Sequence, residues 1–221
     1  METIAFCEIE PYCQKVLAKH WPDIPIYEDV RNVTRERLNA DGIFPDIITG
    51  GFPCQDLSVA GHQAGITGSR SGLWGEVARI IGEIQPKYAI MENVSALLAG
   101  DRGGWFGRVL GDLAEVGYDA EWHCIRPDAV GFPTNRDRVW ICAYPAEKYV
   151  AQVVDPGRLS LEFRGMGAAH FSEFGWKVDE SQMGRSADGV PDDVDRFEAL
   201  GNSVYPQIPE IIGRAIMEVE K

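Results

Sequence analysis

The chain has 221 residues, of which 45% are hydrophobic and 25% charged, and its formal net charge is −13. This composition is ordinary for a folded globular protein and excludes a wholly disordered chain, and the apolar runs are too short to span a bilayer. Only 21 side chains are basic, which disfavours general nucleic-acid binding because non-specific affinity comes from cations that neutralise phosphates. Any nucleic acid must therefore be held by a local basic patch or a specific pocket.

The hydrophobic pattern predicts short strands that alternate with helices. The predicted strands cover residues 3–9, 24–27, 46–49, 88–92, 119–125 and 138–144. The predicted helices begin near Pro11, Leu73, Trp105 and Ile208. This alternation indicates an α/β fold with a largely parallel sheet and helices on both faces.

Residues 146–195 break the pattern, because they are rich in Gly, Ser and Asp and have no steady period. We interpret them as a short irregular insert between a core of residues 1–145 and a C-terminal segment, residues 196–221, whose helix returns to the core. The five cysteines form an odd, scattered set without a CxxC pair, so we expect no disulfide framework and no metal site. Reduced thiols and the lack of a signal sequence at Met1 fit a cytoplasmic location.

Cys54 lies in the stretch GGFPCQDLS, directly after the predicted strand at residues 46–49. Ligands bind at the carboxyl ends of strands in α/β sheets, so a thiol at this place is either a nucleophile or a small buried hydrophobe. For a cysteine taken alone, the buried and inert state is the commoner one.

Four short motifs follow one another along the chain, and two of them fall at predicted strand ends. They are Gly51-Phe52-Pro53-Cys54-Gln55, Met91-Glu92-Asn93-Val94, Asn135-Arg136-Asp137-Arg138 and Gly201-Asn202-Ser203-Val204. Each is weak alone, but the ordered set resembles the cytosine-C5 DNA methyltransferase family of bacteria and phages, from about residue 2 to the C-terminus. The resemblance implies a Rossmann-like, S-adenosylmethionine-dependent methyltransferase sheet, with residues 146–195 as a small target-recognition insert.

The resemblance also implies the catalytic roles. Cys54 would add as a thiolate to C6 of cytosine, since cysteine is a strong nucleophile near neutral pH, and Pro53 would fix the backbone before it. Glu92, in a desolvated pocket, would protonate N3 of the base. Arg136 and Arg138 would hold the flipped nucleotide and orient Glu92.

For the cofactor, the resemblance implies a set of residues at the first two strand ends, at the Leu73 helix and near the C-terminus. Glu8 would bind the ribose hydroxyls, Ile9 would pack on the adenine and Asp29 would accept from its amino group. Leu73, Asn202 and Ser203 would line or close the same cleft. Without the resemblance, Glu8 and Asp29 would be read as solvated strand ends.

One feature of the family is expected to be absent. Its usual first strand and glycine-rich turn have no counterpart before Met1, so we expect a sheet without this central strand and weak binding of S-adenosylmethionine. The expected partner is duplex DNA, and no membrane association is expected. A restriction endonuclease is expected as a functional rather than a physical partner. The complete protein is expected to be a monomer in the cytoplasm of a bacterium or phage host. A tRNA cytosine methyltransferase and a silent fragment that only binds DNA or a partner remain as alternatives.

Overall fold

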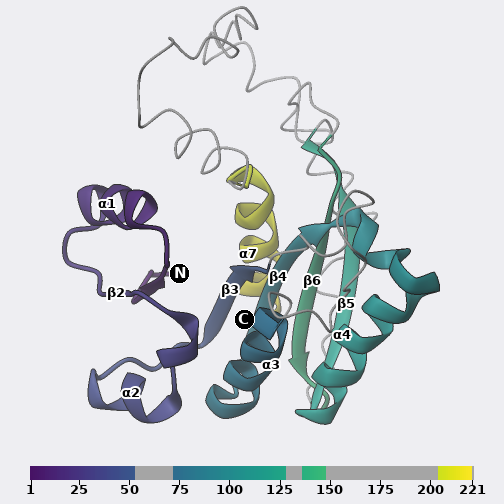
Figure 1. Ribbon diagram of the computed structural model, residues 1–221, viewed down its shortest axis with the longest axis horizontal. Helices are drawn as coiled ribbons and strands as arrows, with labels where there is room; N and C mark the ends of the chain where they lie inside the picture. Colours follow the sequence, from purple (N-terminus) through teal and green to yellow (C-terminus); the bar gives the residue numbers. More distant parts are fainter. Residues whose placement is uncertain (53–71, 128–135, 148–203, 221) are drawn as a thin grey trace, which may run out of the picture.

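The computed structural model describes residues 1–52, 72–127, 136–147 and 204–220 (Figure 1). Four predicted site residues, Pro53, Cys54, Asn202 and Ser203, lie outside the described residues. So does nearly all of the predicted insert, from residue 148 onward.

Four strands form the main sheet, in the order β3-β4-β6-β5. They are β3 (Ile47–Gly51), β4 (Tyr88–Val94), β5 (Tyr118–Ile125) and β6 (Arg138–Pro145). β3 and β4 are parallel, whereas β6 is antiparallel to both of its neighbours. The α/β class is confirmed, but the prediction of a largely parallel sheet is wrong. β5 and β6 follow each other with no helix predicted between them, and parallel neighbours need a crossover, usually through a helix.

Helices cover both faces of this sheet, as predicted (Figure 1). They are α3 (Gly72–Ile84), α4 (Gly104–Glu115) and α7 (Gln207–Val219). α3 and α4 pack on one face and α7 packs on the other. Side chains alternate along a strand, so Met91 of β4 faces α3 and α4 while Ile90 faces α7. Glu92, two residues after Ile90, therefore also lies on the α7 face.

The packing of α7 fixes one wall of the site described below. Ile208, Ile211, Ile212 and Ile216 lie on one stripe of the helix, and each is 2% exposed or less. Burying an isoleucine side chain stabilises a fold by roughly 1.5–3 kcal/mol, so this stripe holds the helix firmly on the sheet. The stripe is the one that the sequence predicts.

The N-terminal residues form a second, two-stranded parallel sheet. Its elements are β1 (Phe6–Cys7), α1 (Pro11–His20) and β2 (Ile26–Tyr27). Both strands are shorter than predicted, but α1 begins at Pro11 as expected, because proline is favoured in the first turn of a helix.

A short helix, α2 (Arg35–Ala40), follows β2 and was not predicted. Thr34 caps it by accepting a hydrogen bond from the Arg37 backbone N–H at 3.2 Å. Its six residues bury only Leu38, which is too little for a hydrophobic period to be visible in the sequence.

The N-terminal part is attached to the main sheet through α3. The apolar residues Val33, Leu38 and Ile43 of the N-terminal part form one buried cluster with Ile80 of α3. Arg79 of α3 adds polar links, because its Nη2 donates to the backbone oxygens of Val33 at 3.0 Å and of Val30 at 3.3 Å.

Among the described strands, β1 pairs only with β2 and β3 pairs only with β4. One edge of β3 therefore faces the N-terminal sheet without a strand partner in the described part of the chain (Figure 1). The expectation of an absent central strand stays a prediction. No helix in the described ranges is both long and apolar enough to cross a membrane.

Candidate active site

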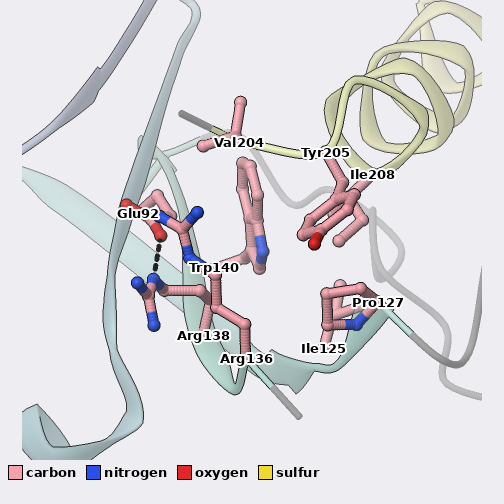
Figure 2. Close-up of a pocket in the computed structure, with 9 residues that line it drawn as sticks. All are labelled: Glu92, Ile125, Pro127, Arg136, Arg138, Trp140, Val204, Tyr205 and Ile208. Carbon is pink, nitrogen blue, oxygen red and sulfur yellow. Dashed lines mark ion pairs between the residues drawn. The ribbon is translucent and has the colours of Figure 1, made fainter. Parts of the chain in front are cut away.

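Glu92 and Arg138 form an ion pair in a pocket between the main sheet and the start of α7. Arg138 Nε lies 2.7 Å from Glu92 Oε1, and the two side chains are 22% and 14% exposed (Figure 2). Arg138 Nη1 also donates to the backbone oxygen of Asp137 at 3.0 Å, which holds the guanidinium from a second side. A pair shielded to this degree interacts more strongly than one in open solvent.

The strand register brings this pair together. β4 and β6 are antiparallel, with Glu92 opposite Trp140 and Val94 opposite Arg138. Arg138 is thus a diagonal neighbour of Glu92, within reach of a long side chain. Trp140, two residues after Arg138, faces the same side of the sheet.

The carboxyl group of Glu92 has an altered acidity. Burial raises the pKa of Glu92 above its ordinary value, and the charges of Arg138 and Arg136 oppose this effect without cancelling it. Glu92 therefore keeps a proton at a higher pH than an exposed glutamate would. The role of Glu92 as a proton donor stays a prediction.

Arg136 lies beside the pair. Its pKa is lowered mainly by burial and next by the charge of Arg138, while Glu92 opposes the shift. Arginine nonetheless stays cationic in proteins. Two guanidiniums thus face one carboxylate in a chain whose net charge is −13, and this local positive charge suits a phosphate-bearing ligand.

The pocket itself is a narrow hollow of about 220 Å³, which includes space open to solvent. Its lining residues are Glu92, Ile125, Pro127, Arg136, Arg138, Trp140, Val204, Tyr205 and Ile208. Figure 2 shows the charged side chains on one side of the Trp140 ring, with Tyr205 and Ile208 on the other. The enclosed part of the hollow has room for about one water molecule, so it is far smaller than the roughly 300–1,000 Å³ of drug-sized sites.

The end of β3 adjoins Glu92. Gly51 is paired with Glu92 in the parallel register, and a Cβ at Gly51 would lie 3.3 Å from Glu92 Oε2. Asn93, only 3% exposed, donates from Nδ2 to the backbone oxygen of Phe52 at 3.1 Å. Its Oδ1 accepts from the Val94 N–H at 2.8 Å, so this buried amide is satisfied at both ends. The chain is thereby fastened beside Glu92 as far as Phe52.

Two predicted cofactor residues, Glu8 and Asp29, come together just after β1 and β2. The Cys7 thiol lies near both carboxylates, and burial, followed by the charges of Asp29 and Glu8, raises the pKa of Cys7 to about 11. Ile9 is 60% exposed beside Glu8. A carboxylate next to an exposed apolar side chain fits a nucleoside, which offers hydroxyl donors and a flat ring. Leu73 is partly buried in the first turn of α3.

The Asp29 carboxylate is already occupied. Its Oδ1 accepts from the Arg31 backbone N–H and from Arg31 Nε, both at 2.9 Å. Its Oδ2 accepts from Arg31 Nε at 3.0 Å and from Nη2 at 2.6 Å. A carboxylate has about four acceptor positions, so an adenine amino group must displace one of these contacts.

The predicted site residues leave out six that line the pocket, among them the aromatic residues Trp140 and Tyr205. A signal for Trp140 was present, because residues at i and i+2 of a strand share a face and Arg138 was already assigned to the site. Tyr205 gave no comparable signal, since its place depends on how α7 returns to the sheet.

The mixed α/β sheet with helices on both faces is similar in fold to solved methyltransferase structures. A solved structure of a putative DNA modification methyltransferase from an E. coli prophage superposes with a TM-score of 0.55 at 22% identity, covering 66% of this chain and 41% of that one. The model of the C-5 cytosine-specific DNA methylase family matches residues 1–179, and the chain belongs to this family.

Curated relatives agree with this assignment. The chain is 30% identical over 197 residues to the type II methyltransferase M2.BsuMI of Bacillus subtilis, covering 86% of this chain and 49% of the relative. It is 31% identical over 144 residues to the type II methyltransferase M1.ScrFI of Lactococcus lactis, covering 65% of this chain and 36% of the relative. The chain thus spans half or less of the length of these relatives.

Proposed function

We propose that this chain carries the catalytic core of a DNA methyltransferase that transfers a methyl group from S-adenosylmethionine to C5 of cytosine in duplex DNA. The observation that best supports the proposal is the partly buried ion pair of Glu92 and Arg138 beside the end of β3. Family membership and the names of the relatives support the same reaction class.

In this proposal Cys54 is the nucleophile. Its thiolate forms a bond to C6 of the cytosine, and the electron pair displaced from the C5–C6 double bond is taken up through N3. Glu92 donates its proton to N3, which leaves a neutral enamine whose C5 is nucleophilic. After C5 has taken up the methyl group, a base removes the proton from C5. The bond between Cys54 and C6 then breaks to release the thiolate, and N3 returns its proton to Glu92.

The described geometry supports these roles in three ways. The raised pKa of Glu92 favours the proton that N3 requires. Arg138 holds the carboxyl in place, and Arg136 adds positive charge for a nucleotide phosphate. Asn93 fastens Phe52, two positions before Cys54, to the strand that carries Glu92. The target atom is inaccessible inside a duplex, so the proposal includes flipping of the base out of the duplex.

For the cofactor, we propose that Glu8 and Ile9 hold the adenosine end, with Asp29 joining when Arg31 yields one of its contacts. Leu73, Asn202 and Ser203 complete the proposed set. S-adenosylmethionine, when bound, supplies an electrophilic methyl group. We further propose that residues 146–195 choose the target sequence, that a bacterial or phage genome encodes the protein, and that it acts in the cytoplasm.

The transfer of tritiated methyl groups tests this proposal. Unmethylated duplex DNA and tRNA are offered separately to the chain with labelled S-adenosylmethionine. We expect labelled 5-methylcytosine in DNA only, and we expect it to form slowly because this chain should bind S-adenosylmethionine weakly. Label in tRNA alone would establish the tRNA methyltransferase alternative, and no label together with no cofactor binding by calorimetry would establish the silent fragment.

A further inference from the structure

The carboxylate of Asp29 stands at the start of a short 3-10 turn, η1 (Val30–Asn32). Asp29 caps this turn, because its Oδ1 accepts from the Arg31 backbone N–H at 2.9 Å. The turn closes with a hydrogen bond from the Val33 N–H to the Val30 oxygen at 3.1 Å. The position of the Asp29 carboxylate therefore depends on where this one turn stands.

Arg79 of α3 holds the other end of the same turn. Its Nη2 donates to the Val33 oxygen at 3.0 Å and to the Val30 oxygen at 3.3 Å. A carbonyl oxygen has two lone pairs, so the Val30 oxygen can accept from the guanidinium as well as from the Val33 N–H. The turn is thus held at one end by Asp29 and at the other by a side chain from a different helix.

Two carboxylates of α3 fix the guanidinium in turn. Arg79 Nε lies 2.8 Å from Glu76 Oε2, Nη1 lies 2.8 Å from Glu83 Oε1, and the Arg79 side chain is 29% exposed. Glu83 also accepts from the Arg35 backbone N–H at 3.3 Å, at the start of α2. Each of the three guanidinium nitrogens therefore has a different partner. Lysine has a single nitrogen on a flexible stem and cannot reproduce this fork.

The other contacts of the N-terminal part do not orient the turn as closely. The apolar cluster of Val33, Leu38, Ile43 and Ile80 joins this part to α3, but hydrophobic contact is non-directional. Among the described strands, β1 and β2 pair only with each other, so no ladder between them and the main sheet fixes their direction. Hydrogen bonds to two carbonyl oxygens do fix a direction, and Arg79 supplies them.

We propose that Arg79 is a positioning residue for S-adenosylmethionine, because it fixes the turn that presents Asp29. This inference rests on the proposed function, which assigns Glu8 and Asp29 to the adenosine end. The Glu8 N–H donates to the Tyr27 oxygen at 2.9 Å, so pairing with β2 already holds Glu8. Asp29 lies beyond the end of β2, and Arg79 gives it the corresponding support. A shift of the turn changes the spacing of the two carboxylates and weakens a ligand that needs both.

The test is a double-mutant cycle of Arg79→Lys and Asp29→Ala in the full chain, with two readouts. The first is the affinity for S-adenosylmethionine, measured by ligand-observed NMR titration because binding is expected to be weak. The second is the rate at which iodoacetamide alkylates Cys7 at mildly alkaline pH, followed by mass spectrometry of the Cys7 peptide. The charge of Asp29 contributes to the raised pKa of Cys7, so a displaced Asp29 leaves more thiolate and faster alkylation.

In the chain that keeps Asp29, Arg79→Lys should bind S-adenosylmethionine about threefold to tenfold more weakly, as expected for one lost hydrogen bond, and its Cys7 should react faster. In the Asp29→Ala background Arg79→Lys should change neither readout. The control Arg108→Lys alters an ion pair with Asp112 on α4 and should change neither readout in either background. In a preparation that transfers methyl groups, Arg79→Lys should raise the KM for S-adenosylmethionine and leave kcat unchanged.

Equal effects of Arg79→Lys in both backgrounds would make Arg79 a merely structural residue and overturn the inference. Unchanged affinity and unchanged Cys7 reactivity in the chain that keeps Asp29 would overturn it as well. If Arg79→Lys does not fold, Glu76→Gln takes its place in the cycle, because it removes one of the two carboxylates that hold the guanidinium. A wild type that binds no S-adenosylmethionine, with Cys7 responding as expected, would refute the proposed function and leave the placement of Asp29 by Arg79 standing.

Discussion

Replacing Gly51 with alanine should disturb Glu92, whereas the same change at Gly50 should not. A Cβ at Gly51 would lie 3.3 Å from Glu92 Oε2 and 3.7 Å from the Glu92 backbone oxygen. A Cβ at Gly50 would meet nothing within 4 Å. The two glycines are adjacent in β3, so they form a matched pair that differs only in the face of the sheet.

The expected magnitudes follow from two opposing effects. Replacing glycine with alanine at a compatible position stabilises a fold by about 0.4–1 kcal/mol, because the unfolded chain loses freedom. Gly50→Ala should show this gain. In Gly51→Ala the new methyl group must push the carboxyl by a few tenths of an ångström and strip water from it. The stability gain should therefore be smaller, and the added desolvation should raise the pKa of Glu92 further.

The assay is thermal unfolding of both variants together with a ¹³C titration of the Glu92 carboxyl. In a preparation that transfers methyl groups, Gly51→Ala should also turn over several times more slowly, since a misplacement of 1 Å costs up to about 100-fold. Equal stabilities and equal Glu92 titrations in the two variants would refute the claim that Gly51 leaves room for the carboxyl group.

Three further predictions concern the acid, the cofactor site and the insert. Glu92→Gln should slow single-turnover methyl transfer strongly while DNA binding stays nearly intact, and equal single-turnover rates would reduce Glu92 to a structural role. The pKa of Glu92 is higher in the folded chain than in the unfolded chain, so the wild type should lose unfolding free energy as the pH rises from the unfolded pKa through the folded pKa. The variant should lack this part of the fall. Arg31→Ala should tighten S-adenosylmethionine binding severalfold in calorimetry, because it frees acceptor positions on Asp29. The control Arg37→Ala removes the similarly exposed ion pair with Asp41 and should leave the affinity unchanged. Weaker binding in Arg31→Ala would show that Arg31 orients Asp29 instead. Exchange of residues 146–195 for a relative's insert should change the methylated sequence, and a chimera that keeps the original target would refute the assignment.

Much of the fold was predictable because its long elements have clear periods. α3 and α7 present regular apolar stripes, and a buried strand such as β4 is a continuous apolar run. The alternation of strands and helices favoured a parallel sheet, and the signal against it was the lack of a predicted helix between β5 and β6. The short helix α2 was not predicted, because it buries a single side chain and so shows no hydrophobic period.

The residues of the site also divide into those that the sequence predicts and those that depend on the folded structure. Glu92 and Arg138 were found through short motifs, and the register of β4 and β6 brings them into contact. The occupied state of Asp29 could not be read from the sequence, since it depends on the conformation of Arg31, an exposed side chain. Trp140 required knowledge of what lies over the sheet, because it packs in one cluster with the isoleucines of α7.

The central claim is that Cys54 attacks cytosine in DNA, and trapping on 5-fluorocytosine tests it most directly. In duplex DNA that carries this base, the fluorine at C5 cannot leave as a proton does, so the bond between Cys54 and C6 should persist after methylation. We predict, in a preparation that transfers methyl groups, a stable protein–DNA adduct whose mass spectrum assigns the link to the peptide containing Cys54, and no adduct with Cys54→Ser. Methylation of ordinary DNA by Cys54→Ser at the wild-type rate, or an adduct on another residue, would contradict the account.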